Sequence, residues 1–414
     1  MKCHNKSSVR GSVVGVMVCM MQAPSAQTLA AQTLESGVND IKLTAAEQLI
    51  YDDNLYRLPG NAEVASVVSP DARREDFISR TSLATDAQLV TSLQTLLVSG
   101  SIARNSFKHN DELDNTEGNG KLQWNWATGS VLSGKLGGDY SHTLANFANS
   151  RVYLKDMLDR WGYFGELAYA VGPSWQLKVG GRHLETEHGL AERRFDNLSS
   201  NSGTGSIEYT TPDENLIGVD YRYEKGEFKD DPAVQPGPSS LNYKESQTSL
   251  HSRIALGSKT KLETSLGYLR HEYPLDTASN FAGGVGRMEL GWELSVKTQL
   301  TVAGWRELRA NQDVESDYFI GQGGSVNLAW LTTEFFHVSL QGSREQRRYL
   351  PAEDITLTLP RRQDRQTEAR AGLTYIPRRW LQLEGFFAFE QRDSNRDLQS
   401  YRDRLSGLTV RIIF

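Results

Sequence analysis

The chain ends in LSGLTVRIIF, residues 405–414, and this stretch alternates apolar and polar side chains. Leu408, Val410, Ile412 and Phe414 share one parity, whereas the other parity is mostly small or polar. Successive side chains of a β-strand point to opposite faces, so the stretch predicts a strand with one apolar face. Such a strand fits a sheet packed on a soluble core, and it also fits a wall that faces lipid.

The composition is polar for a chain with so much alternation. Mean hydropathy is −0.49, and 38% of residues are apolar and 23% charged. No run approaches the roughly 20 apolar residues that a membrane-spanning helix requires, which excludes helical spans. The net charge of −6 is small among so many charged groups and argues against a nucleic-acid binder.

The terminal alternation recurs along the chain. In each window, apolar or aromatic side chains take one parity and charged or polar side chains the other, so the period is two and not 3.6. The windows are LQWNW (122–126), WQLKVGGR (175–182), IGVDYRYE (217–224), MELGWELSV (288–296), FHVSLQGSREQR (336–347) and LQLEGFFAFEQR (381–392).

Two kinds of connection separate these strands. Short turns are predicted at TDAQ (85–88), ATGS (127–130), GPS (172–174), PDE (212–214), GSKT (257–260), VKT (296–298), LTTE (331–334) and IPRR (376–379), about 42 residues apart. The intervening connections, such as 225–242 and 310–317, are longer and polar. Tight turns at one end and long loops at the other are typical of bacterial outer-membrane barrels.

The predicted fold class is therefore all-β, a transmembrane antiparallel up-and-down barrel of about 18 strands with short periplasmic turns and long extracellular loops. A propeller could also give a period of about 42 residues, but each period here holds two long strands and not four short ones. A soluble stack of sheets would alternate too, without segregating loop lengths in this way.

The N-terminus has the layout of a secretory signal. Lys2, Lys6 and Arg10 precede a short apolar run and the small residues of QAPSAQ, which predicts a signal peptide over 1–26. A short periplasmic segment (27–40) and the barrel (41–414) would follow. Both cysteines, Cys3 and Cys19, lie within the predicted signal, so the exported chain would have no disulfide or cysteine metal site.

The polar parity of the strands should face a water-filled lumen. The structural alternative is that these charges only pair with one another and hydrate the wall. The candidate lumen-lining residues are Lys178, Arg182, Asp220, Arg222, Arg253, Glu289, Glu293, Glu384, Arg392 and Arg411. No G-x-S-x-G, H-E-x-x-H or P-loop motif occurs and the histidines are scattered, so we predict no enzyme, metal site or cofactor.

The closing strand has a second reading. An apolar alternation that ends in a C-terminal Phe resembles the signal that outer-membrane barrels present to the assembly machinery. The matching positions are Leu408, Val410, Ile412 and Phe414. The resemblance implies the assembly machinery as a partner.

Two further stretches resemble a family. YDDNLYRLPG (51–60), followed by REDFISRTSL (74–83), is similar to the opening of the EpsL-type outer-membrane proteins of exopolysaccharide operons, which occur in bacteria with the exosortase system. The segment 266–308 resembles a hairpin of the same family. Its matching residues are Gly267, Tyr268, Arg270, Phe281, Gly283, Gly286, Arg287, Trp292, Arg306, Glu307 and Leu308.

The resemblance implies a non-enzymatic role in exopolysaccharide export, as a conduit or docking component in the outer membrane of a Gram-negative bacterium. The alternatives are a diffusion porin for small solutes and a plugged barrel that anchors surface polysaccharide. A long loop that folds inward, such as residues 226–242, would favour the plugged barrel. Expected partners are outer-membrane lipid and lipopolysaccharide, the exopolysaccharide, and a periplasmic export protein. No nucleic acid is expected.

Overall fold

The structure is a computed structural model that describes residues 39–149, 152–229, 242–275, 277–313, 316–349 and 361–414. The predicted signal peptide (1–26) and most of the segment 27–40 lie outside these residues. No helix in the described part is both long and apolar enough to span a membrane.

Eighteen strands make up almost all of the regular structure. They are β1 (Asp40–Asp52), β2 (Asp76–Thr91), β3 (Gln94–Phe107), β4 (Asn115–Thr128), β5 (Leu132–Leu144), β6 (Met157–Val171), β7 (Trp175–His188), β8 (Leu198–Thr210), β9 (Leu216–Phe228), β10 (Tyr243–Ala255), β11 (Thr260–Glu272), β12 (Phe281–Ser295), β13 (Thr298–Asp313), β14 (Ser316–Leu331), β15 (Phe336–Tyr349), β16 (Gln363–Arg378), β17 (Leu381–Ser394) and β18 (Tyr401–Ile413). The helical pieces are α1 (Val64–Val67), η2 (Asp111–Leu113), η3 (Phe147–Asn149), η4 (Ala191–Asp196) and η5 (Thr277–Ser279).

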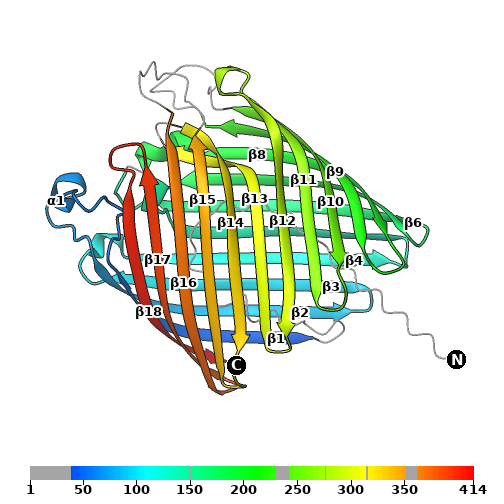
Figure 1. The fold of residues 1–414 in the computed structure, drawn as a ribbon, viewed down its shortest axis with the longest axis horizontal. Helices are drawn as coiled ribbons and strands as arrows, with labels where there is room; N and C mark the ends of the chain where they lie inside the picture. Colours follow the sequence, from blue (N-terminus) through cyan, green and yellow to red (C-terminus); the bar gives the residue numbers. More distant parts are fainter. Residues whose placement is uncertain (1–38, 150–151, 230–241, 276, 314–315, 350–360) are drawn as a thin grey trace.

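Every strand pairs antiparallel with its neighbours in sequence, and β1 pairs with β18 to close the ring. Figure 1 shows the wall of β10 to β18 crossing in front of the wall of β1 to β8, with α1 at one end of the barrel. At the seam, Leu43 and Phe414 exchange two backbone hydrogen bonds of 3.2 and 2.8 Å. Closure leaves no unpaired sheet edge, as a β-structure in lipid requires. The predicted fold class is confirmed.

The two ends of the barrel differ as expected. Connections of two to five residues join the strands at the end where β1 begins and β18 stops, whereas the opposite end carries connections such as 53–75 and 145–156. One long loop was predicted wrongly, because β13 and β14 extend to Asp313 and Ser316, which pair with each other.

The turn predicted at TDAQ (85–88) is also wrong. These residues lie within β2 and pair with β1, and the turn follows at 92–93, where Ser92 has a φ of +56°. Asp86 and Gln88 lie on the inward parity of β2, where a polar side chain suits a strand that lines a wet lumen. In the sequence, the polar residues Asp86 and Gln88 therefore look like part of a turn, although they belong to a strand.

The outward face of the barrel is apolar and bounded by aromatic pairs. Leu340 and Leu408 are 44% and 67% exposed on this face. Phe336 stacks on Tyr375 near the short turns, with ring centroids 4.7 Å apart. An apolar belt with aromatic side chains near its rim is the surface of a β-barrel embedded in the outer membrane.

Candidate functional site: the lumen and the loops that cross it

The inward face is fixed by the strand register, because outward positions alternate strictly with inward ones. The ten candidate residues predicted from the sequence all lie on strands β7, β9, β10, β12, β17 and β18, on the parity opposite the exposed apolar side chains. Their contacts differ from one sector of the wall to the next.

On β7, both candidate cations are paired. Lys178 lies 2.7 Å from Glu208, and Arg182 lies 2.8 Å from Asp139 while its guanidinium covers the ring of Phe164 at 5.7 Å. The Arg182 and Asp139 side chains keep 39% and 34% exposure, so water and a solute can reach this pair.

On β9, both candidates join networks with β10. Asp220 lies 2.6 Å from Nδ1 of His251. Arg222 contacts Glu224 at 2.7 Å and also pairs with Glu245. Each side chain thus offers both a charge and a hydrogen-bonding group to the lumen.

The sector at β10–β12 is the most open to water. Arg253 pairs with Glu263 at 3.0 Å, and Glu289 lies 3.4 Å from Arg287. Glu263 and Glu289 stand directly opposite each other, a like-charge arrangement that requires solvation, and their side chains are 55% and 42% exposed. Glu293 lies on the same face and is also exposed.

On β17 and β18, the candidates are more buried. Glu384 lies 3.4 Å from Arg370 and 3.9 Å from Arg411. Arg392 is 1% exposed and donates a hydrogen bond to the carbonyl oxygen of Ala148, in the connection between β5 and β6. A wall residue therefore holds a loop that begins six strands away around the ring.

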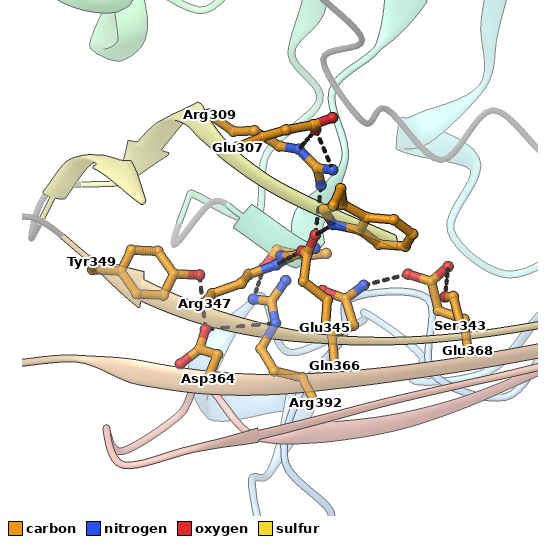
Figure 2. Close-up of polar contacts among 12 residues, drawn as sticks. Glu307, Arg309, Ser343, Glu345, Arg347, Tyr349, Asp364, Gln366, Glu368 and Arg392 are labelled. Atoms are coloured by element: carbon orange, nitrogen blue, oxygen red, sulfur yellow. Dashed lines mark hydrogen bonds and ion pairs between the residues drawn. The ribbon is translucent and has the colours of Figure 1, made fainter. Parts of the chain in front are cut away.

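The wall from β13 to β17 carries a continuous polar network (Figure 2). Glu345 accepts hydrogen bonds from Trp305 at 2.7 Å, Arg309 at 2.8 Å and Arg347 at 2.7 Å. Gly323 makes room for the indole, because a Cβ there would stand 2.8 Å from the Trp305 ring. Farther along the network, Tyr349 donates to Asp364 at 2.8 Å. Each carboxylate has several donors, which fixes its position.

The loop 53–75 builds an apolar cluster at the long-loop end of the barrel. Tyr56 and Leu58 are fully buried, and the Tyr56 ring lies 5.1 Å from the ring of Phe147. The Tyr56 hydroxyl lies 3.1 Å from both Asn110 and Glu112 of the loop between β3 and β4. Burial, with the charge of Glu112, raises the pKa of Tyr56, so the hydroxyl stays protonated and donates. The loop 53–75, the β3–β4 loop and the β5–β6 loop thus share one core.

Asp76 fixes the base of this core. Its fully buried carboxylate accepts hydrogen bonds from the backbone N–H groups of Lys108, His109 and Asn110 at 2.9 to 3.2 Å, and from the Asn110 side chain at 2.7 Å. A buried carboxylate is stable only with several donors of this kind.

Arg57 ties the loop 53–75 to the inward wall. It lies 3.0 Å from Asp52, 2.9 Å from Asp403 and 3.8 Å from Glu390, and its φ is +56°. Asp52, Asp403 and Asp53 are close enough together to resemble a cation site, but the guanidinium already supplies the positive charge there. Burial alone would lower the pKa of Arg57; the three surrounding carboxylates outweigh burial and raise it, so the side chain stays charged.

The described residues 145–149 of the connection 145–156 reach across the lumen. The connection leaves β5, and its η3 turn contacts β13, eight strands away in a ring of eighteen. Ala148 is held there by Arg392 of β17. Because β5 and β13 lie almost opposite each other in the ring, this loop narrows the passage along which a solute would move.

The end of that loop is fixed by contacts of Asp156 with His188 and Leu190, which we call the clasp. Asp156 lies 2.6 Å from Nδ1 of His188 and accepts a hydrogen bond from the Leu190 N–H at 3.0 Å. Burial alone would raise the pKa of Asp156, but these hydrogen bonds and the nearby charges of His188 and Arg193 outweigh it and lower the pKa. Burial raises the pKa of Asp196, although Arg193 lies 2.9 Å away.

Sequence reasoning missed the residues that narrow the lumen. It pointed to residues 226–242 as a loop that could fold inward, and most of that segment lies outside the described residues. A signal for the loop 53–75, which packs against Phe147 of the loop 145–156, was present in YDDNLYRLPG (51–60), where polar, aromatic and apolar residues are mixed without alternation. That mixture indicates a packed loop, but it does not say where the loop packs.

Comparison with known proteins gave structural likeness only. No family model and no curated protein matches the chain. OccK2 (OpdF) of Pseudomonas aeruginosa, solved with glucuronate, has a TM-score of 0.49 and 12% identity over 91% of this chain and 98% of its own. The BenF-like porin of Pseudomonas fluorescens Pf-5 has a TM-score of 0.49 and 10% sequence identity, over 91% of this chain and 99% of its own. OpdK of Pseudomonas aeruginosa, solved with vanillate, has a TM-score of 0.47 and 9% sequence identity, over 91% of this chain and 99% of its own. The likeness is one of barrel architecture.

Proposed function

We propose that the protein is an outer-membrane diffusion channel for small hydrophilic solutes. The observation that carries this proposal is the loop 145–156, which spans the ring between β5 and β13 and is anchored by Arg392. A folded-in loop reduces a wide barrel to a narrower passage, while exposed inward charges such as Glu263 and Glu289 keep the remaining passage wet.

The wall chemistry favours solutes that exchange hydrogen bonds. Inward acids and bases are largely paired, as in Lys178–Glu208 and Arg182–Asp139, so neither sign of charge dominates these sectors. A solute that replaces its hydration shell by these donors and acceptors would pass in steps, because each contact is weak enough to release. Polar metabolites of modest size fit this wall better than apolar or highly charged ones.

A long polymer fits the narrowed passage less well, because a chain needs a free path through the whole lumen. The exopolysaccharide role implied by the EpsL-type resemblance therefore stands second, as a prediction. A sealed barrel that anchors surface polysaccharide is the third function, and it is favoured by the buried core around Tyr56 and by the tether of Arg57.

Conductance of the refolded barrel in a planar bilayer tests the proposal. We expect discrete steps in the unmodified protein, and larger steps or longer openings in Arg392→Gln, which releases Ala148 and the loop. The matched control is Arg253→Gln, which removes an inward arginine from an exposed pair on β10. A silent bilayer with correctly folded protein would support the sealed barrel, and conductance blocked by added exopolysaccharide would restore the polymer conduit.

A further inference from the structure

Five arginines stand on the outward face of the barrel, at the long-loop end of strands β15 to β18. Each is exposed and occupies an outward position that continues the apolar parity of its strand. The register places Arg365 opposite Gln346 of β15, and Arg402 opposite Gln391 of β17, so the side chains share one continuous patch. The outer arginine patch consists of Arg344, Arg348, Arg365, Arg402 and Arg404.

The patch is not neutralised by the protein. Within the described residues, none of its five side chains forms an ion pair or a side-chain hydrogen bond. Two acids lie beside the five arginines. Asp393 of β17 stands directly opposite Arg365 and accepts a hydrogen bond from Gln391, and Asp53 accepts a hydrogen bond from the backbone N–H of Arg404.

Outward arginines on other strands of the rim have partners, and so do several lysines. Arg104 lies 3.3 Å from Asp114, and Arg270 lies 2.6 Å from Glu272. On β9, Lys225 pairs with Glu227. The patch on β15 to β18 therefore differs from the rest of the rim in presenting unpaired guanidinium groups to the surroundings.

The height of the patch matches the headgroup region of a membrane. Phe336 marks the aromatic rim near the short turns, and Arg344 lies eight residues farther along β15. At about 3.3 Å per residue and a tilt of about 40°, this separation spans roughly 20 Å of membrane, near the upper edge of an apolar band of about 25 Å. Arginine side chains extend from such a position into the headgroups.

We propose that the outer arginine patch binds the phosphorylated headgroup of lipopolysaccharide in the outer leaflet. Guanidinium groups bind phosphate through paired N–H donors, and several on one rigid sheet hold such a headgroup with little loss of conformational entropy. Five arginines stand beside two acids, Asp393 and Asp53, and the phosphates of the lipid supply the remaining negative charge. The proposal rests on the barrel's position in the outer membrane and does not depend on whether the lumen conducts.

The test uses the refolded full-length barrel in detergent micelles, titrated with fluorescent lipid A that carries two phosphates and with its dephosphorylated form. One variant changes all five arginines of the patch to glutamine. The matched control removes five cations from the rest of the long-loop end, where several are paired: Arg104, Lys225, Lys229, Lys244 and Arg270 to glutamine.

We expect the patch variant to bind bisphosphorylated lipid A at least about tenfold more weakly, equivalent to about 1.4 kcal/mol, and the control to bind within about twofold of the unmodified protein. The proposal would be overturned if the patch variant and the control variant bound bisphosphorylated lipid A with equal affinity. It would also be overturned if the unmodified protein bound dephosphorylated lipid A as tightly as the bisphosphorylated form. A patch variant that keeps its lipid affinity but loses self-association in sedimentation would overturn it too, because the patch would then join two copies of the chain.

Two controls separate this proposal from the channel proposal. Folding of each variant is checked by the difference in gel mobility between heated and unheated protein. Conductance is measured in a bilayer without lipopolysaccharide, where the patch variant is expected to keep the unmodified step size. Loss of lipid binding with intact conductance supports the patch, whereas loss of conductance alone concerns only the lumen.

Discussion

At the scale of single residues, Arg57 determines whether the loop 53–75 stays against the wall. Its guanidinium is shared by Asp52, Asp403 and Glu390, and the two nearer carboxylates are 4% and 0% exposed. Three carboxylates in a water-poor pocket repel one another unless a cation lies between them. The position of the loop and the charge state of the wall are thus coupled through one side chain.

Replacing this cation gives a stability prediction. Arg57→Gln should lower the free energy of unfolding by about 3–5 kcal/mol, because it leaves buried carboxylates without their partner. The measurement is urea unfolding in lipid vesicles, followed by tryptophan fluorescence. Arg253→Gln serves as the control, since its pair with Glu263 is 33% and 55% exposed and should contribute at most about 1 kcal/mol. Equal losses in the two variants would contradict this role of Arg57.

Asp156 gives a prediction about pH. Its pKa is lowered in the folded protein from an ordinary value of 3.8, so its contribution to loop stability is fully present above that value. The contribution is lost as pH falls through the lowered pKa. Pepsin should therefore cleave the loop 145–156 faster as pH falls from about 4 to about 2, beyond the intrinsic activity profile of the protease.

The control for Asp156 is Asp156→Asn, which should be cleaved readily at every pH in that range. Asp196 has the opposite sign: its pKa is raised, so its contribution is present below pH 3.8 and declines as pH rises. A cleavage profile that is unchanged in Asp156→Asn would remove Asp156 from the clasp.

The contacts of Arg57 could not be predicted from the sequence. Its partners Glu390 and Asp403 lie more than three hundred positions away. Asp403 is on β18, which pairs with β1 only when the ring closes, and Glu390 is on β17, the next strand. The alternation of β17 and β18 correctly assigns these acids to the inward parity. It contains no information about which loop folds inward to meet them.

At the scale of elements, period-two alternation predicted strands well wherever the outward face was apolar. The window 288–296 lies almost wholly in β12, and the window 381–392 lies in β17. Errors arose where the inward face looked like a turn, at 85–88, and where polar strand ends rise above the membrane, at 310–317. The wet interior therefore explains the error at 85–88, and strand ends that extend beyond the apolar belt explain the error at 310–317.

The closing strand gives a prediction about assembly. Phe414 is 72% exposed, and only its backbone bonds to Leu43. Deleting Phe414 should leave refolding into detergent nearly unchanged, since the side chain packs little, but should reduce the amount of barrel that reaches the outer membrane in cells. The check is quantitative blotting of membrane fractions beside the refolding yield.

The control for that deletion is Phe336→Ala, which removes an outward aromatic ring of similar position from a central strand. If both variants reach the membrane in equal amounts, Phe414 acts only as one more lipid-facing residue. If refolding of the deletion also fails, the strand is needed for closure and the assembly role of Leu408, Val410, Ile412 and Phe414 stays a prediction.

At the scale of the whole molecule, the outside, the wall and the loops have separate tasks. The outward belt is apolar, the inward networks are polar, and the connections 53–75 and 145–156 share a buried core at the long-loop end. The first two could be predicted from residue parity alone, because each strand carries both patterns. The third depends on which loops fold inward, and loops have no periodicity from which their direction could be deduced.

The seam between β1 and β18 has one more consequence. A closed ring has no first member: Leu43 and Phe414 are hydrogen-bonded neighbours, so the two ends of the barrel chain meet at the same rim. A circular permutant that joined these ends and opened at the turn 129–131 would keep all of the strand pairings around the wall. It would also move Phe414 into the middle of the chain. Such a permutant would therefore separate the closure of the ring from the assembly signal proposed for the last strand.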